Sequence, residues 1–339
     1  MMKNLIKIIC VVITLTLFSC DKESTESVVD NPAFLTSLSF KSIIEIENNN
    51  FEDQMPGFLA NPSDNSLYIS CRNKNLTYLE TTYKLNLNDL KLISKNATIT
   101  DFVTKRNYIY NNQLYVFGAA KYTIYDLDLN TTTPSTPYLP NNSFSRFGFT
   151  AQNENVYIIG GFLGGSTQDP TYDKKIYKLN LNTNKFLEFA TMPKNRNGSS
   201  AEIVDNKIYS FFGYENIKSN TTSPSIQMLD DLQIYDINSN SFQTINLAKN
   251  VNVSFTAKYK NYIFVAGNKT TGSTSTVING SFFGYFDTKT NVMTEIPITV
   301  ENNNLNFPYI CEIEVMNNKI YALVKNSPSA FSIQVANLK

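Results

Sequence analysis

The sequence predicts an all-β protein made of six similar units. One strand pattern recurs six times, polar turn residues separate the short apolar runs, and no segment has the spacing of a long helix. In each unit, Asn or Asp leads into a run of apolar and aromatic residues. The aromatic anchors of these runs lie 42 to 57 residues apart, and they are Tyr68, Tyr115, Tyr157, Tyr209, Phe264 and Tyr321.

Each anchor strand is followed by a variable loop and a second alternating strand, as in Tyr83 to Leu87 and Tyr177 to Leu181. A polar turn then leads to a short outer strand, for example the one that contains Phe186. The turns are rich in Asn, which tolerates a positive φ angle. Repeats of forty to fifty residues with several short strands are typical of propeller blades. The sequence therefore predicts a six-bladed β-propeller over residues 36–339.

The sixth unit lacks an outer strand, because the chain ends at Lys339 soon after the strand at Ile333. A segment of the same character, Lys41 to Ile46, stands near the start of the chain. We expect this N-terminal strand to complete the last blade, since ring closure removes exposed sheet edges. The substitution Ile43→Asp should then weaken the whole ring.

The fourth unit has the most complete set of recurring residues: Met192-Pro193, Arg196, Ser199-Ser200, Asp205-Asn206 before Tyr209, Gly213, and Asp231 to Asp236. This pattern resembles the kelch repeats of the galactose oxidase and kelch-like superfamily, and the resemblance covers nearly all of the chain after the leader. There are departures, because only the third unit keeps a Gly pair, and Phe186 or Phe242 stands where kelch repeats have Trp. The resemblance implies a kelch-type β-propeller.

The first nineteen residues resemble a secretory signal. Lys3 and Lys7 precede an apolar run from Ile8 to Phe18, which is too short to anchor a chain across a bilayer. Leu17-Phe18-Ser19-Cys20 resembles the lipobox of bacterial lipoproteins, which implies cleavage before Cys20 and lipidation of its thiol. An ordinary signal peptide with a chance Cys is the alternative. Residues 20–35 form a polar tether.

The tether begins with Asp21-Lys22-Glu23, which resembles the export signal of surface lipoproteins in the Bacteroidota. In enteric bacteria, an Asp in that place would instead imply retention in the inner membrane. We expect an outer-membrane lipoprotein of the cell envelope, on the cell-surface or the periplasmic side, bound to the membrane through its lipid.

Composition excludes several classes of chemistry. The chain contains no His, so it has neither a Ser–His–Asp nucleophile nor His ligands for zinc or copper. Galactose oxidase itself needs His for its copper site. Lys and Arg together number 29, equal to Asp and Glu, and no basic stripe suggests nucleic acid. We expect no cofactor and no metal; Asp236 to Asn240 lacks the Gly and distal Glu of a calcium loop.

Two groups of charged residues are candidate ligand contacts. Arg106, Arg146 and Arg196 each precede the first strand of a unit, and three guanidinium groups converging on the axis would bind carboxylates. Glu312 and Glu314 are two apart on a strand, so they face one side and suit proton transfer or cation binding. The alternatives are Arg side chains that bond neighbouring blades, and Glu side chains paired to Lys or Arg.

Phe162 and Tyr214 belong to long loops that follow the anchor strands of the third and fourth units. Their rings are candidates for stacking on a sugar or peptide, although such loops also serve as plain solvent-exposed connections. Cys71 and Cys311 fall in neighbouring blades, either as a disulfide or as two packed thiols.

We expect a binding module for a protein, peptide or glycan rather than an enzyme, because the sequence holds no recognisable catalytic set. The alternative is a kelch-type sugar-modifying enzyme. Some periplasmic kelch propellers are sialic-acid epimerases, and this resemblance implies that the three Arg hold a carboxylate while Glu312 or Glu314 moves a proton. A structural subunit of an outer-membrane complex is a third possibility.

Overall fold

The computed structural model describes residues 34–47, 55–72, 79–98, 104–134, 136–138, 144–163, 171–217, 225–274, 278–303, 309–327 and 330–338. The expected leader, Cys20 and most of the tether lie outside these residues. The chain divides into residues 1–34 and 35–339, and the fold concerns the second unit. Among the described residues, no helix has the length and apolarity needed to cross a membrane.

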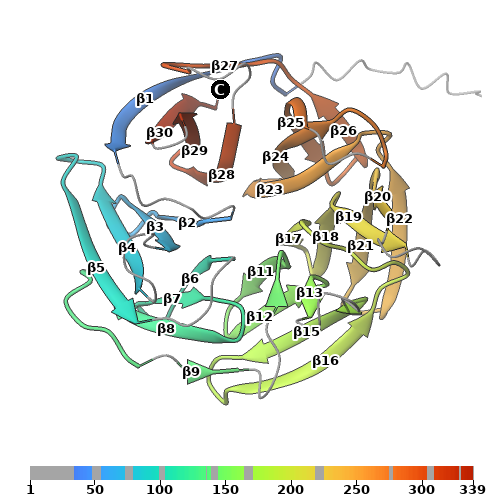
Figure 1. Cartoon of the computed structure of the whole chain (residues 1–339), viewed down its shortest axis with the longest axis horizontal. Helices are drawn as coiled ribbons and strands as arrows, with labels where there is room; N and C mark the ends of the chain where they lie inside the picture. The colour runs from blue at the N-terminus through green and yellow to red at the C-terminus, as the bar shows by residue number, and fades with distance from the viewer. Residues whose placement is uncertain are drawn as a thin grey trace, which may run out of the picture. The chain divides into compact units, whose positions relative to one another are not determined.

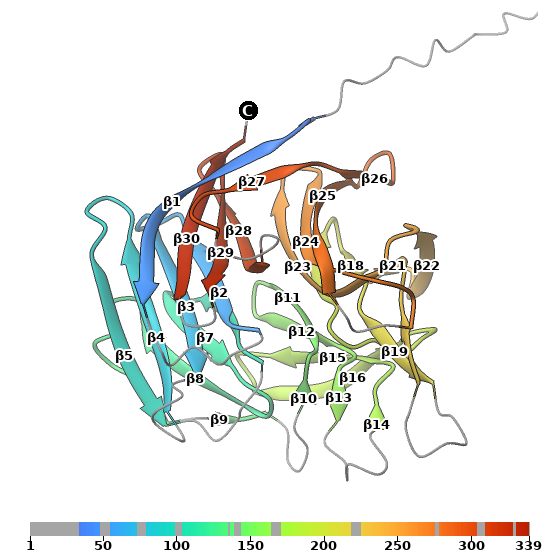
Figure 2. The same ribbon diagram turned by 45° about the horizontal axis from the view of Figure 1, so that its top comes forward.

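Six antiparallel sheets form a ring around a central channel, as predicted (Figures 1 and 2). We refer to the four successive strands of each blade as a, b, c and d. Blade 1 contains β2 (Gly57–Asn61), β3 (Ser66–Arg72), β4 (Leu79–Asn86) and β5 (Leu92–Thr98). Blade 2 contains β6 (Arg106–Tyr110), β7 (Gln113–Phe117), β8 (Lys121–Asp126) and β9 (Thr136–Pro137). Blade 3 contains β11 (Gly148–Gln152), β12 (Asn155–Ile159), β15 (Lys175–Asn180) and β16 (Lys185–Thr191). Blade 4 contains β17 (Ser200–Val204), β18 (Lys207–Phe211), β21 (Asp231–Asp236) and β22 (Ser241–Asn246). Blade 5 contains β23 (Val251–Tyr259), β24 (Tyr262–Thr270), β25 (Ile278–Asp287) and β26 (Val292–Glu295).

The sixth blade is closed by the N-terminal strand, which confirms the expected ring closure. Its strands are β28 (Tyr309–Met316), β29 (Lys319–Ser327), β30 (Ala330–Asn337) and β1 (Leu38–Glu47). Lys41 pairs with Val335 and Ile46 with Phe331, with a bulge between Ser42 and Ile44. A further strand, β27 (Ile298–Val300), pairs parallel to β1 and was not predicted. The first and last strands that the structure describes therefore share one sheet.

Tight a–b turns set the register of the innermost strands. The two central residues of these turns have positive φ, 49° and 59° at Asn111 and Asn112, and 49° and 58° at Asp205 and Asn206. Two positive φ angles define the type I′ turn, whose twist matches that of a β-hairpin. The Asn-rich turns predicted from the sequence thus fix which side chains of each strand a face the channel.

The hydrophobic core lies between neighbouring blades. One cluster joins Ile69 and Cys71 of blade 1 with Cys311, Leu323 and Ile333 of blade 6. Both cysteines are buried thiols with no disulfide between them. Where kelch repeats have Trp, Phe186 stacks on Tyr177 with ring centroids 5.0 Å apart. Aromatic packing on the outer strand is therefore kept with a smaller ring.

A buried ion pair links blades 1 and 2. The Lys105 ammonium lies 3.0 Å from the Glu80 carboxylate, and both side chains are almost completely buried. The Tyr125 hydroxyl donates a 3.3 Å hydrogen bond to the same carboxylate. Because a buried charge is costly unless paired and hydrogen-bonded, this arrangement ties the two blades together.

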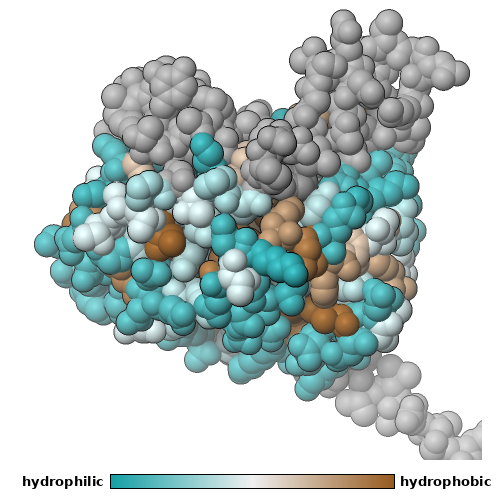
Figure 3. Space-filling view, turned by 90° about the horizontal axis from the view of Figure 1, so that it is seen from below, coloured by the Kyte–Doolittle hydropathy of each residue, from teal (hydrophilic) through white to brown (hydrophobic). Residues whose placement is uncertain are grey.

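The flank that carries β9 and β16 is largely hydrophilic, with only scattered hydrophobic side chains in the described part (Figure 3). Leu187 on β16 is one such residue and is 37% exposed. Scattered apolar side chains are normal for a surface and mark no docking site.

Candidate functional site in the central channel

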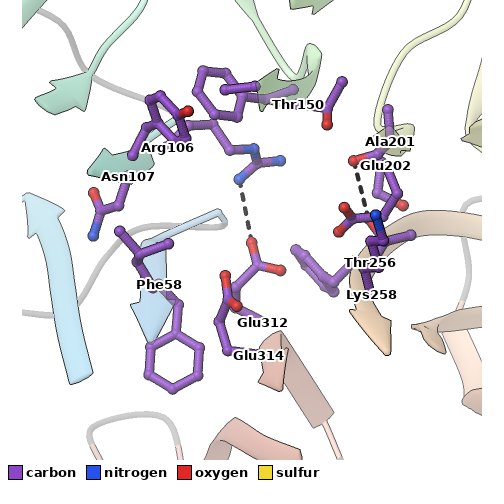
Figure 4. A pocket seen from close by; sticks show the side chains of 16 residues that line it. Phe58, Arg106, Asn107, Thr150, Ala201, Glu202, Thr256, Lys258, Glu312 and Glu314 are labelled. Atoms are coloured by element: carbon purple, nitrogen blue, oxygen red, sulfur yellow. Dashed lines mark hydrogen bonds and ion pairs between the residues drawn. The ribbon is translucent and has the colours of Figure 1, made fainter. Parts of the chain in front are cut away.

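A cavity of about 240 Å³ lies in the channel and is lined by the first strands of all six blades (Figure 4). Its lining residues are Phe58, Leu59, Arg106, Asn107, Tyr108, Phe149, Thr150, Ala151, Ser200, Ala201, Glu202, Phe255, Thr256, Lys258, Glu312 and Glu314. The ring thus brings together side chains that are up to 256 positions apart in sequence. Three of the predicted site residues, Arg106, Glu312 and Glu314, are among them.

The cavity opens on the face of the a–b turns. Along β23, Phe255 is buried, Thr256 is half-buried and Lys258 is exposed. Glu312 is likewise buried, whereas Glu314, nearer the turn, is half-buried. Exposure therefore increases along these strands toward the a–b turns, which places the polar side chains of the outer part within reach of a solute.

The inner part of the cavity contains an ion pair between blades that are not neighbours. An Nη atom of Arg106 lies 3.5 Å from a carboxylate oxygen of Glu312, across the channel from blade 2 to blade 6. Each residue lies four positions before the last residue of its strand, Tyr110 in β6 and Met316 in β28. Because Arg106 and Glu312 occupy equivalent positions on equivalent strands, their side chains lie at the same depth in the channel.

The outer part of the cavity holds a second set of polar groups two residues further along the same strands. Tyr108, Glu202 and Glu314 each lie two positions before the end of β6, β17 and β28. Side chains two residues apart point to the same face of a strand. The residues of this outer set therefore face the channel, as Arg106 and Glu312 do. Lys258 stands at the mouth, where its ammonium donates to the carbonyl of Ile203 over 3.4 Å.

Burial dominates the electrostatics of the three glutamates. It raises the pKa of Glu312 to about 8, although Arg106 acts in the opposite direction. Burial also raises the pKa of Glu202 to about 7, against the effect of Lys258 and a hydrogen bond from Thr256. The pKa of Glu314 is raised well above its ordinary value by burial and by the other two carboxylates. Glu202 and Glu312 therefore exchange protons in the neutral range.

Aromatic residues also line the cavity. Tyr108, Phe149 and Phe255 come from three different blades, whereas the ring of Phe58 belongs to the core cluster between blades 6 and 1. The Tyr108 hydroxyl donates to the carbonyl of Asn153 over 2.9 Å, which fixes the ring against blade 3. A concave site with aromatic walls and a few convergent polar groups is the usual form of a small-ligand site.

The three arginines do not converge, which corrects the expectation from their spacing. Ser200 and Gly148 are the strand positions equivalent to Arg106, since each lies four residues before its strand end. Arg146 therefore stands two residues before that position and Arg196 four before it. The three arginines precede or begin a first strand at different distances from its end, and the strand pairing shows this offset.

Arg196 is completely buried and serves the frame. Its guanidinium pairs with the Asp231 carboxylate and donates to the carbonyl of Phe212 over 2.6 Å. This is the alternative considered for these arginines, a side chain that bonds blade carbonyls. A ligand would have to disrupt this packing to reach it.

Arg146 and Tyr214 lie beyond the start of the strands, at the opposite end from the cavity mouth. Arg146 donates a 2.6 Å hydrogen bond to the hydroxyl of Tyr214, which is itself buried. Phe162 belongs to a small sheet of β10 (Phe144–Ser145), β13 (Phe162–Leu163) and β14 (Thr171–Tyr172). Tyr214 opens the hairpin of β19 (Tyr214–Ile217) and β20 (Ser225–Met228). None of these three residues lines the cavity.

Sequence reasoning missed Tyr108, Glu202 and Lys258. The signal was available, because Glu202 stands in β17 at the position that Glu314 has in β28. Among the described residues, no group of three or more acidic or Cys side chains is arranged to hold a metal ion. Asp236, considered for calcium, accepts backbone hydrogen bonds from Asn238 and Ser239 in a c–d turn.

Fold and site together define a six-bladed β-propeller with a small polar cavity on its axis. Residues 143–193, which span most of blade 3, match the Kelch motif family. The chain is thus a β-propeller with a Kelch motif, as the repeat pattern predicted. The solved structure titled "Structure of YjhT" is similar to it, with a TM-score of 0.55, 12% identity, and coverage of 71% of this chain and 83% of that one.

That identity is low, so the likeness shows the shared fold alone. No curated protein matches the sequence.

Proposed function

We propose that the protein is a binding module that holds one sugar unit of a glycan in its central channel, without catalysis. The observation that supports this is the cavity lining, where Arg106, Glu202, Glu312 and Glu314 lie together with the aromatic residues Tyr108, Phe149 and Phe255. Carboxylates and a guanidinium match the hydroxyls of a sugar, and rings pack on its C–H faces.

The size of the cavity favours a small ligand. Its volume is about 240 Å³, and drug-sized ligands fill sites of roughly 300–1,000 Å³. A single sugar ring, at the end of a chain or free, suits this space better than a folded peptide. A peptide or protein ligand, considered from the sequence, would have to bind on the outer faces instead.

A glycan-binding screen with the purified chain tests the proposal. Thr150 lines the cavity at the position of β11 that is equivalent to Glu202 and Glu314, so Thr150→Trp should fill the channel and abolish binding. Thr244→Trp on the exposed outer strand β22 adds the same ring outside the channel and should bind normally. Binding that survives Thr150→Trp in a folded protein would place the ligand elsewhere and refute the proposal.

A sugar-modifying enzyme, such as a sialic-acid epimerase, is the second candidate. It is favoured by one specific observation, that Arg106, Glu312 and Glu314 share a cavity. Arg106 would hold an acidic sugar after exchanging Glu312 for the ligand's carboxylate, and a glutamate with a raised pKa would move a proton. Nuclear magnetic resonance of acidic sugars in heavy water tests this, since turnover would show as deuterium uptake or faster anomer exchange.

We also propose that the module is a lipoprotein of the outer membrane, held through Cys20 on the periplasmic or the cell-surface side. The lipobox-like sequence supports this. Metabolic labelling with an acyl chain should mark the wild type and not Cys20→Ser. Labelling that is equal in both would refute lipidation at this residue.

A further inference from the structure

The cavity contains more carboxylates than cations. Its charged lining residues are three glutamates and two basic residues, Arg106 and Lys258. Each basic residue is already engaged. Arg106 pairs with Glu312 at 3.5 Å. Lys258 donates to the carbonyl of Ile203, and its charge lowers the pKa of Glu202, whereas no cation lowers the pKa of Glu314. One carboxylate is left over.

The remaining carboxylate is that of Glu314. In the part of the chain that the structure describes, no Lys or Arg lies within ion-pair distance of it. Its charged neighbours are Glu202 and Glu312, both acidic. Figure 4 shows Glu314 beside Glu312 at the wall of the cavity, with Glu202 on the other side. A ligand entering from the a–b turns therefore meets a half-buried carboxylate that lacks a positive partner.

A protonated amino group complements this arrangement. Because burial favours the protonated form of Glu314 in the empty cavity, the ammonium group would displace that proton into solvent. The carboxylate would then gain the charged hydrogen bond that the protein does not supply, and such bonds are roughly twice as strong as neutral ones. The rings of Tyr108 and Phe255 in the same lining also favour a cation, because their faces attract positive charge. A ligand carboxylate at this place would instead add a fourth acidic group.

We infer that the sugar held in the channel is an amino sugar, with its free ammonium group bound by Glu314 between Glu202 and Glu312. This inference rests on the proposed function, because it names the class of sugar that the same cavity takes. Arg106 and Lys258 remain with their own partners and leave the hydroxyl groups of the sugar to Tyr108, Thr150 and Ser200.

Isothermal titration with four probes tests the inference at about pH 6.5, where an amino group is protonated. The probes are glucosamine, glucose, N-acetylglucosamine and glucuronic acid. We expect glucosamine to bind at least about tenfold more tightly than glucose, which corresponds to about 1.4 kcal/mol. Glu314→Gln should reduce this preference to about twofold or less. Glu188→Gln, on the exposed outer strand β16, is the matched control and should leave it unchanged.

Each outcome separates the two proposals once the variants are shown to be folded by circular dichroism. Equal binding of glucose and glucosamine would overturn the inference and leave the proposed function standing. A glucosamine preference that Glu314→Gln does not change would overturn the role of Glu314. Preference for glucuronic acid would overturn the inference in favour of the acidic-sugar enzyme. Binding of no sugar by the folded wild type would refute both.

Discussion

Arg106 and Glu312 form an ion pair over 3.5 Å that crosses the channel from blade 2 to blade 6 and passes over blade 1. Both side chains are about nine-tenths buried. The pair forms the inner boundary of the candidate site, and the outer glutamates stand between it and the mouth. Burial raises the pKa of Glu312 to about 8, so this residue titrates near neutral pH.

Stability should fall as pH rises from about 5 to about 8. The folded state keeps protons on Glu202 and Glu312 above pH 4.5, since their pKa values are raised to about 7 and about 8, whereas the unfolded chain has lost them. The folded state therefore binds more protons in this window, and its stabilisation is lost as pH rises through the folded pKa values. Thermal melting at several pH values measures this effect.

Glu312→Gln is the matched variant for that experiment. It removes one of the titrating groups and keeps its shape, so the fall of the melting temperature between pH 5 and 8 should become shallower. A domain of this size shifts by about 2–4 °C for each kcal/mol. An unchanged slope in the variant would contradict the raised pKa of Glu312.

Ring closure should depend on the buried face of β1. Ile46 is 6% exposed in the cluster shared by blades 6 and 1, so Ile46→Asp should destabilise the protein by ~3 kcal/mol or more. Lys41→Asp, an exposed position on the same strand, should have little effect. Denaturant unfolding measures both. Ile43, considered from the sequence, lies at the bulge and is only half-buried, so it is the weaker test.

The buried pair of Glu80 and Lys105 should matter far more than a surface pair. Lys105→Met leaves a buried carboxylate without its cation, which costs about 3–5 kcal/mol. Lys249→Met, which removes one of the partly exposed partners of Glu295, should cost less than about 1 kcal/mol. Similar losses in the two variants would show that blades 1 and 2 are not joined as described.

The two thiols should resist modification in the folded protein. Cys71 and Cys311 are 1% and 2% exposed, and burial raises the pKa of Cys311 to about 12. Because the thiolate is the reactive form, alkylation followed by mass spectrometry should label neither until the protein is unfolded. Rapid labelling of Cys311 under native conditions would contradict its placement in the core.

The sequence was sufficient to predict the ring because repeats, Asn-rich turns and strand alternation are local features. Six strand patterns and one spare N-terminal strand determined blade number and closure. The site was only partly predictable. Glu312 and Glu314 lie on one strand, so the sequence showed them as a pair. Glu202 and Lys258 are each the single charged residue of the cavity on their strand, and their place beside the other charged residues becomes visible only when the blades are arranged in a ring. The sequence did not show that Arg146 and Arg196 lie two and four residues before the position equivalent to Arg106. That offset can be recognised only from the pairing of the strands.

The location of a bound sugar shows most directly whether the central channel is the binding site. A crystal structure of the protein with the tightest-binding sugar from the screen would show where it lies. The account predicts the sugar in the channel, in contact with Tyr108, Glu202 and Glu314. A sugar bound at the opposite end, over Arg146 and Tyr214 with the channel empty, would contradict it.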